Sequence, residues 1–196
     1  IMETGVSTDP RAGFGRKEYR ASRIDFREKV WPIAREWCGG GELILVEDVP
    51  DTLGIASRLA RSLDTYAGID ALQLLPEVGL IRGISSRVQY ERAYPTLTLK
   101  LSSGDGRVPE LLRRKAVFSE PDRGWIVSAV TVQAYLTEPG GSVLYVCMAR
   151  TWDLYVCATR GLCREQPANR FDGSRFVAVA VEDLAAAGFH VEQWSR

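Results

Sequence analysis

Apolar residues follow a helical spacing near the start of the chain. Over residues 16–37 they recur about every 3.6 positions, which predicts one amphipathic helix. Pro32 predicts a break or kink midway, and Ser22 or Asp25 offers an N-cap for a fresh start. The glycines at 39–41 end the helical pattern.

Three further segments have patterns that predict a strand or a helix. Residues 42–49 favour a short strand, with a buried helical turn as the alternative. Residues 52–63 follow a capping Asp51 and carry one apolar face, which predicts a helix. Residues 108–118 predict another, with its proline at an early position where proline is tolerated.

The remaining apolar segments are short and bounded by turn residues, which is typical of strands. A first group lies at 69–75, 79–90 and 96–102, and short links between these segments predict an antiparallel meander. A second group has strands at 125–136, 142–149 and 176–181, a strand or helix start at 153–159, and a short helix at 182–188.

This order of elements predicts the fold class. Helices, a meander, a helix, further strands and a small final helix indicate an α/β or α+β fold, in which helices flank one mixed central sheet. We expect residues 1–15 to form a flexible tail and residues 16–196 a single domain.

Composition narrows the function classes. The 196 residues are 45% hydrophobic and carry zero formal net charge, so attraction to nucleic acid requires a local basic patch. No apolar run reaches the ~18 residues of a membrane helix, and the first residues lack the apolar core of a secretory signal. We therefore expect a cytoplasmic protein without membrane association.

Several common chemistries find little support. The single histidine, His190, gives a histidine-based catalytic triad only one base, and the glycine loops that bind phosphate are absent. The four cysteines form no CxxC pair. We expect Cys147 and Cys157, both in apolar runs, to pack as small hydrophobic side chains.

Polar residues interrupt the predicted meander in a regular way. Alternate strand residues share a face, so Arg87 lies with Gln89. If the strands pair in order, one side of the sheet collects Asp70, Arg87, Gln89, Lys100 and Glu110. One interpretation is a solvated face with weak surface ion pairs. The other is a functional cluster, because the flanking runs are strongly apolar.

The segment from Gly39 to Phe118 resembles the core of the PD-(D/E)xK nucleases. The resemblance rests on a helix, then Gly68-Ile69-Asp70, a turn, and a strand that ends in Arg87-Val88-Gln89. It implies a restriction-endonuclease-like core in which a divalent metal, Mg²⁺, polarises the scissile phosphate.

In that family an acid-x-lysine occupies the position of Arg87-Val88-Gln89. The resemblance implies Asp70 and Glu110 as metal ligands. It further implies a catalytic set of Asp70, Gln89, Lys100 and Glu110.

Basic residues supply a candidate nucleic-acid surface. A spacing of three and four places Arg16, Arg20, Arg23 and Arg27 on one helix face. Together with Arg87, Arg113 and Lys115 they would track phosphates. The alternative is an ordinary solvated helix face.

Two function classes follow. The first is a nucleic-acid-acting protein with a nuclease-like core, either a Mg²⁺-dependent endonuclease or a degenerate relative. The alternative is a non-catalytic module that binds a protein or a nucleic acid, such as an accessory, defence or mobile-element protein. DNA, RNA and a protein are the candidate partners, and apolar edge strands allow a homodimer.

Overall fold

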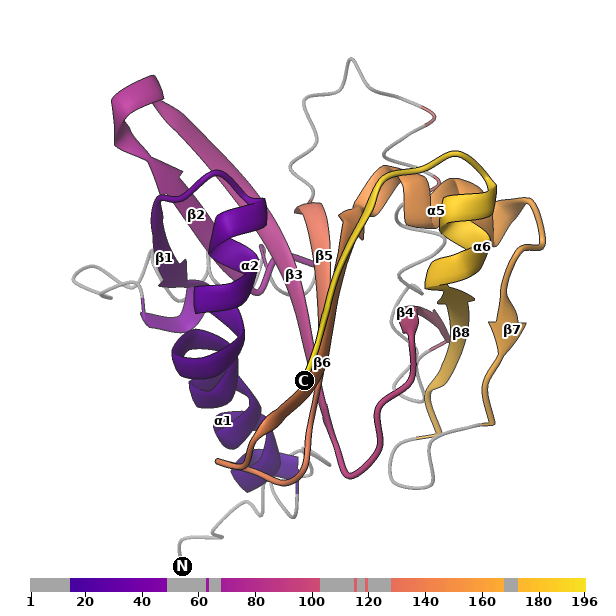
Figure 1. The fold of residues 1–196 in the computed structure, drawn as a ribbon, viewed down its shortest axis with the longest axis horizontal. Coiled ribbons are helices and arrows are strands. Elements are labelled where there is room, and N and C mark those ends of the chain that lie inside the picture. Colours follow the sequence, from indigo (N-terminus) through magenta and orange to yellow (C-terminus); the bar gives the residue numbers. More distant parts are fainter. Residues whose placement is uncertain are drawn as a thin grey trace, which may run out of the picture.

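A computed structural model describes residues 15–48, 63, 68–102, 115, 119, 128–167 and 173–196. They form an α+β fold with a mixed six-stranded sheet, a separate three-stranded sheet and a few helices (Figure 1). The predicted fold class is therefore confirmed. Residues 1–14 of the predicted tail lie outside the described residues. So do the predicted helices at 52–63 and 108–118, apart from Leu63 and Lys115.

The first helical run is continuous but changes its winding near Pro32. It comprises α1 (Gly15–Asp25), the π-helical turn η2 (Phe26–Val30) and α2 (Trp31–Trp37). The N–H of Trp31 donates to the carbonyl of Phe26, five residues back. Proline lacks an N–H and collides with the carbonyl four residues before it, so a wider turn accommodates it. The helical run therefore does not break at Pro32, and a π-helical turn precedes the proline instead.

Asp25 is not the N-cap that its residue type suggests. Its backbone is helical, and the residue is buried with 2% exposure. The carboxylate accepts the N–H of Gly140 and the hydroxyl of Tyr90, each at 3.0 Å. Lys29 donates to the carbonyls of Gly140 and Gly141. Asp25 and Lys29 thus bind the helical run to the turn between β5 (Ser128–Leu136) and β6 (Val143–Arg150).

Replacing Asp25 with alanine is expected to lower the free energy of unfolding by about 2 kcal/mol, because it leaves two donors without their charged acceptor. Urea denaturation measures the loss. Glu28→Ala is the matched control, since Glu28 is exposed and makes a 3.6 Å surface ion pair with Arg27. Equal stability of the two variants would contradict the structural role of Asp25.

The six-stranded sheet forms the centre of the molecule (Figure 1). Its strands, in spatial order, are β1 (Glu42–Leu45), β2 (Ala71–Leu75), β3 (Leu80–Tyr90), β5 (Ser128–Leu136), β6 (Val143–Arg150) and β9 (Val191–Ser195). β3 and β5 run parallel, and all other neighbours are antiparallel. The predicted hairpin of β2 and β3 is confirmed, with Gly79 at a φ of 63° in its turn.

The second sheet has the order β4 (Thr96–Ser102), β8 (Arg175–Ala180), β7 (Arg164–Glu165). The meander prediction is therefore wrong for its third strand, which pairs with β8 instead of β3. β5 already occupies one side of β3 over Ile84–Tyr90. The alternating leucines of β4, Leu97 and Leu99, find burial in a second core.

Short helices complete the fold. α5 (Thr151–Thr159) confirms the helical alternative for that segment, and α6 (Val181–Ala186) follows β8 directly. After β1 the chain forms a 3₁₀ turn at Val46–Asp48, and Pro76–Val78 forms another inside the hairpin. Within the described part of the chain, no helix is both long and apolar enough to cross a membrane.

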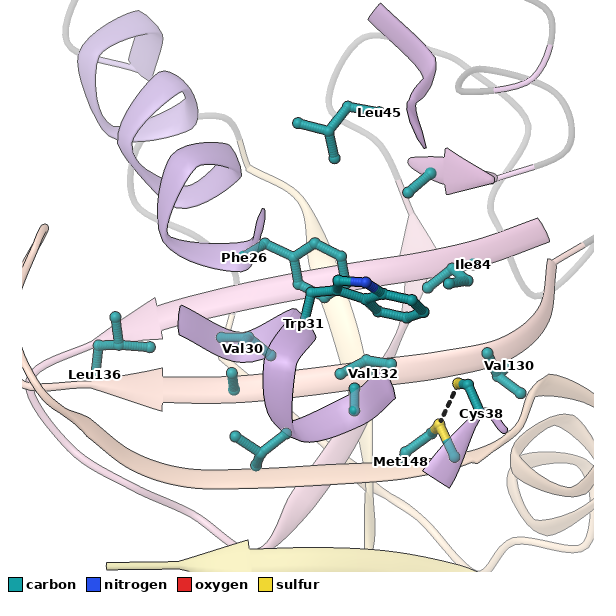
Figure 2. Close-up of a cluster of buried hydrophobic side chains, with 14 residues drawn as sticks. Phe26, Val30, Trp31, Cys38, Leu45, Ile84, Val130, Val132, Leu136 and Met148 are labelled. Atoms are coloured by element: carbon teal, nitrogen blue, oxygen red, sulfur yellow. Dashed lines mark hydrogen bonds between the residues drawn. The ribbon is translucent and has the colours of Figure 1, made fainter. Parts of the chain in front are cut away.

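Two apolar cores lie on opposite faces of the central sheet. On one face, Phe26 and Trp31 from the helical run pack over Ile84 and Val132 (Figure 2). The other core joins β5 and β6 to the second sheet, α5 and α6. It buries Cys147 and Cys157 among apolar side chains, as the sequence predicts. Burying each large apolar side chain stabilises the fold by roughly 1.5–3 kcal/mol.

Candidate functional site

A cleft of about 470 Å³ opens beside β3, between α1 and the second sheet. Its volume falls within the range of about 300–1,000 Å³ that is usual for ligand sites. The described lining residues are Tyr19, Ser22, Ser86, Arg87, Val88, Gln89, Tyr94, Thr96, Thr98, Tyr135, Gln166, Phe176 and Ala178. Among them Arg87 is the one charged side chain.

The cleft follows an open edge of β3. β2 pairs with β3 only as far as Ile84, whose carbonyl accepts the N–H of Asp70 at 2.9 Å. Among the strands that the structure describes, none pairs with this side of β3 beyond that point. Backbone groups of alternate residues point to the same side, so the N–H and C=O of Val88 point toward this edge. The cleft therefore has backbone donors and acceptors as well as side chains.

Asp70 extends the pairing of the hairpin by one residue. Its carboxylate accepts the N–H of Ser86 at 2.6 Å and lies 3.4 Å from the hydroxyl of Ser85. This contact places the Asp70 carboxylate against β3 just before Arg87. Asp70 itself is not among the lining residues of the cleft.

A buried hydrogen-bond network forms the floor. Gln133 Oε1 accepts the N–H and the hydroxyl of Thr98, each at 2.9 Å. The backbone N–H of Thr98 can only donate, so the atom of the Gln133 side-chain amide that faces it must be the oxygen. The amide nitrogen, Gln133 Nε2, therefore faces Tyr135 and donates to its hydroxyl at 2.6 Å. The Tyr135 proton then goes to Thr96, whose hydroxyl is 3.0 Å away. The network ties β5 to β4 and satisfies its own polar groups.

The walls and rim carry a cation, amides and aromatic rings. The guanidinium carbon of Arg87 lies 5.5 Å from the ring centroid of Phe176 on β8, an arrangement that orients the cation. Tyr94 packs edge-on against Tyr135 with centroids 6.1 Å apart, yet half of its surface is exposed. Tyr19 of α1 is also half-exposed.

The predicted site residues are distributed over both sheets. Arg87 and Gln89 line the cleft, and Gln89 is exposed. Lys100 is half-buried on β4, opposite Phe176 in the pairing with β8, and does not line the cleft. Glu110 lies outside the described residues.

The described residues do not by themselves fit a Mg²⁺ site. Among them, no three side chains of His, Cys, Asp or Glu lie close enough together to hold a metal ion. Asp70 contributes one carboxylate and Gln89 only a neutral amide, whereas Mg²⁺ is usually bound through one or two carboxylates. Glu110, the second implied ligand, is not described.

The basic face of the first helix is partly neutralised. Arg23 and Arg27 each lie 3.4 Å from the carboxylate of Asp48. Arg20 is exposed, and the backbone of Arg16 belongs to α1. Lys115 is exposed, and Arg113 lies outside the described residues. This arrangement favours the solvated-face interpretation for Arg23 and Arg27.

The sequence analysis does not identify the residues that form the floor and one wall of the cleft. Gln133 and Tyr135 lie in an apolar strand, and polar residues at alternate positions in such a strand are the signal that could have identified them. Phe176 and Gln166 come from the second sheet and its edge, and no local pattern places them near β3.

Comparison of the chain with protein-family models, with curated proteins and with solved structures finds no match. The function must therefore be argued from the cleft itself.

The buried Tyr135 hydroxyl in the floor predicts that the folded protein loses stability at alkaline pH. Burial raises the pKa of Tyr135 from 10.0 to about 12. The unfolded chain releases this proton at lower pH than the folded protein, so the stability that Tyr135 contributes is complete below about pH 10 and is lost as the pH rises toward 12.

The free energy of unfolding of the wild type exceeds that of Tyr135→Phe by an amount that is expected to fall by about 1 kcal/mol between roughly pH 8 and pH 11. Urea denaturation at both pH values measures it. A constant gap would show that Tyr135 is not protonated and buried as described.

Proposed function

We propose that this protein binds single-stranded nucleic acid in the cleft beside β3. The carrying observation is the set of lining residues: one oriented arginine, exposed tyrosines at the rim, and amides, with no carboxylate among the described members. Arginine pairs with phosphate, and tyrosine rings stack on unpaired bases.

The charge distribution favours a single strand over a duplex. Zero net charge and the pairing of Arg23 and Arg27 with Asp48 leave little positive field for a long duplex backbone. A concave cleft with rim aromatics suits an unstacked base, because base stacking contributes about 1–3 kcal/mol per base.

Fluorescence anisotropy with labelled single- and double-stranded DNA and RNA tests the proposal. We expect single strands to bind more tightly than duplexes of the same sequence, with affinity that falls as salt rises. If neither single nor double strands bind, the proposal fails and a protein partner becomes the better candidate.

Metal-dependent cleavage is a second candidate function, favoured by the contact of the Asp70 carboxylate with Ser86, the residue before Arg87 on β3. The Asp–strand relation that the nuclease resemblance implies is compatible with that position. Cleavage would require acidic ligands beyond those in the described residues.

Incubation of plasmid and oligonucleotide substrates with Mg²⁺ or Mn²⁺ tests this candidate. Asp70→Asn is the informative variant, because it keeps an oxygen acceptor for the N–H of Ser86 while it removes the charge. We expect binding without cutting for both proteins. Metal-dependent cutting by the wild type that Asp70→Asn lowers at least about a hundredfold would establish the nuclease instead.

A further inference from the structure

We infer that the cleft selects adenine. This inference rests on the proposed function, because it names which base of a single strand enters the site. The floor is not the source of selectivity, since Gln133, Thr98 and Tyr135 hydrogen-bond to one another. Recognition must come from the open edge of β3 and from the rim.

Three groups there share one chemical pattern. The peptide groups of Val88 at the open edge and the side-chain amides of Gln89 and Gln166 each offer one donor and one acceptor side by side. Gln89 comes from the central sheet, and Gln166 follows β7 in the second sheet. The N–H of Gln166 donates to the carbonyl of Phe176 at 2.8 Å. This bond fixes the backbone of Gln166 next to Phe176, whose ring contacts Arg87. Residues on two sides of the cleft therefore carry the same donor–acceptor pair.

Among the common bases, adenine matches this pattern on two edges. Its N6 amino group has two hydrogens, one beside the acceptor N1 and the other beside the acceptor N7, and glutamine pairs with N6 and N7 in a bidentate way. Guanine presents two acceptors, O6 and N7, on the second edge. Cytosine and thymine have carbon at the corresponding C5 position. Guanine does have a second donor–acceptor pair, N2–H with N3, but that pair lies on the edge next to the sugar. Among the common bases, adenine alone carries such a pair on each of the two edges that face away from the sugar.

The rim completes the site. Tyr19 and Tyr94 are half-exposed rings on different sides of the cleft, α1 and the link before β4, where a planar base can stack. Arg87, oriented over Phe176, is placed to neutralise the phosphate of the same nucleotide. The same contacts would hold an adenine of a strand or a free adenine nucleotide.

Anisotropy titrations with oligo(dA), oligo(dC) and oligo(dT) of about 12 nucleotides, and with oligo(dT) carrying a few interspersed guanines or adenines, test the inference. We expect adenine-containing strands to bind about tenfold more tightly than the others, since one bidentate pair gives that discrimination. Substituting 7-deazaadenine, which lacks N7, is expected to remove most of the advantage.

A variant pair assigns the selectivity to the cleft. Gln89→Ala combined with Gln166→Ala is expected to abolish the adenine preference, and both residues are exposed, so folding is retained. Gln193→Ala, at an exposed position of β9, is the matched control and should keep the full preference. An adenine preference that survives in the double variant would overturn the assignment.

The remaining outcomes separate this inference from the proposed function. Equal binding of all strands would overturn adenine selection while leaving single-strand binding intact. Binding of adenosine monophosphate, measured by calorimetry, with no binding of any strand would support adenine recognition and overturn strand binding. Failure of both ligands to bind would overturn both.

Discussion

Replacing Arg87 with alanine is expected to weaken the binding of single-stranded DNA by about a hundredfold, since a charge-assisted hydrogen bond contributes roughly 1.5–3 kcal/mol. Arg87 is the one charged residue among the described residues that line the cleft. Its position over Phe176 orients the guanidinium before the ligand arrives, so little side-chain entropy is lost on binding. The slope of log affinity against log salt should also decrease in magnitude by about 0.7.

Arg92→Ala is the matched control for this prediction. Arg92 lies on the same segment of the chain, is exposed, and does not line the cleft. It removes the same charge, so a merely nonspecific electrostatic contribution would weaken binding equally in both variants. Equal losses for Arg87→Ala and Arg92→Ala would place the binding surface elsewhere.

Replacing Gln133 with methionine is expected to lower the free energy of unfolding by about 3 kcal/mol, because buried polar groups lose their hydrogen-bond partners. The N–H and hydroxyl of Thr98 lose their common acceptor, and Tyr135 loses a donor. Methionine has a similar volume, so the loss comes from hydrogen bonding rather than from a cavity. The change also removes the tie between β5 and β4 on which the shape of the cleft depends.

Gln193→Met provides the comparison for this variant. Gln193 accepts one hydrogen bond from Tyr145 at 2.9 Å but lies at an exposed position of β9, so water can replace the contact. We expect a loss of no more than about 0.5–1 kcal/mol, measured by urea denaturation. If Gln133→Met is no less stable than Gln193→Met, the floor network does not hold the two sheets together.

Much of the fold follows from local pattern. The hairpin of β2 and β3 and the pair of β5 and β6 each depend on residues close together in the sequence. Period-two alternation and turn residues are enough to predict them. The sequence does not predict β7 and β9, because β7 is only two residues long and β9 is mostly exposed.

The candidate site could be predicted only in part. The sequence identifies Arg87 and Gln89 because they interrupt an apolar strand. Their neighbours across the cleft, Gln166 and Phe176, depend on the pairing of β4 with β8, which is set by distant packing. Asp25 shows the same limit, because its residue type suggests a cap while its partner Gly140 lies far along the chain.

The most direct test of the central claim, that nucleic acid binds in the cleft beside β3, is ultraviolet crosslinking of the wild-type protein to an adenine-containing single strand. Mass spectrometry then locates the attached peptides. We predict crosslinks on peptides that contain Tyr19 or Tyr94, the two half-exposed rings at the rim. Crosslinks confined to Trp152 or Trp194, which are comparably exposed but outside the cleft, would contradict the account.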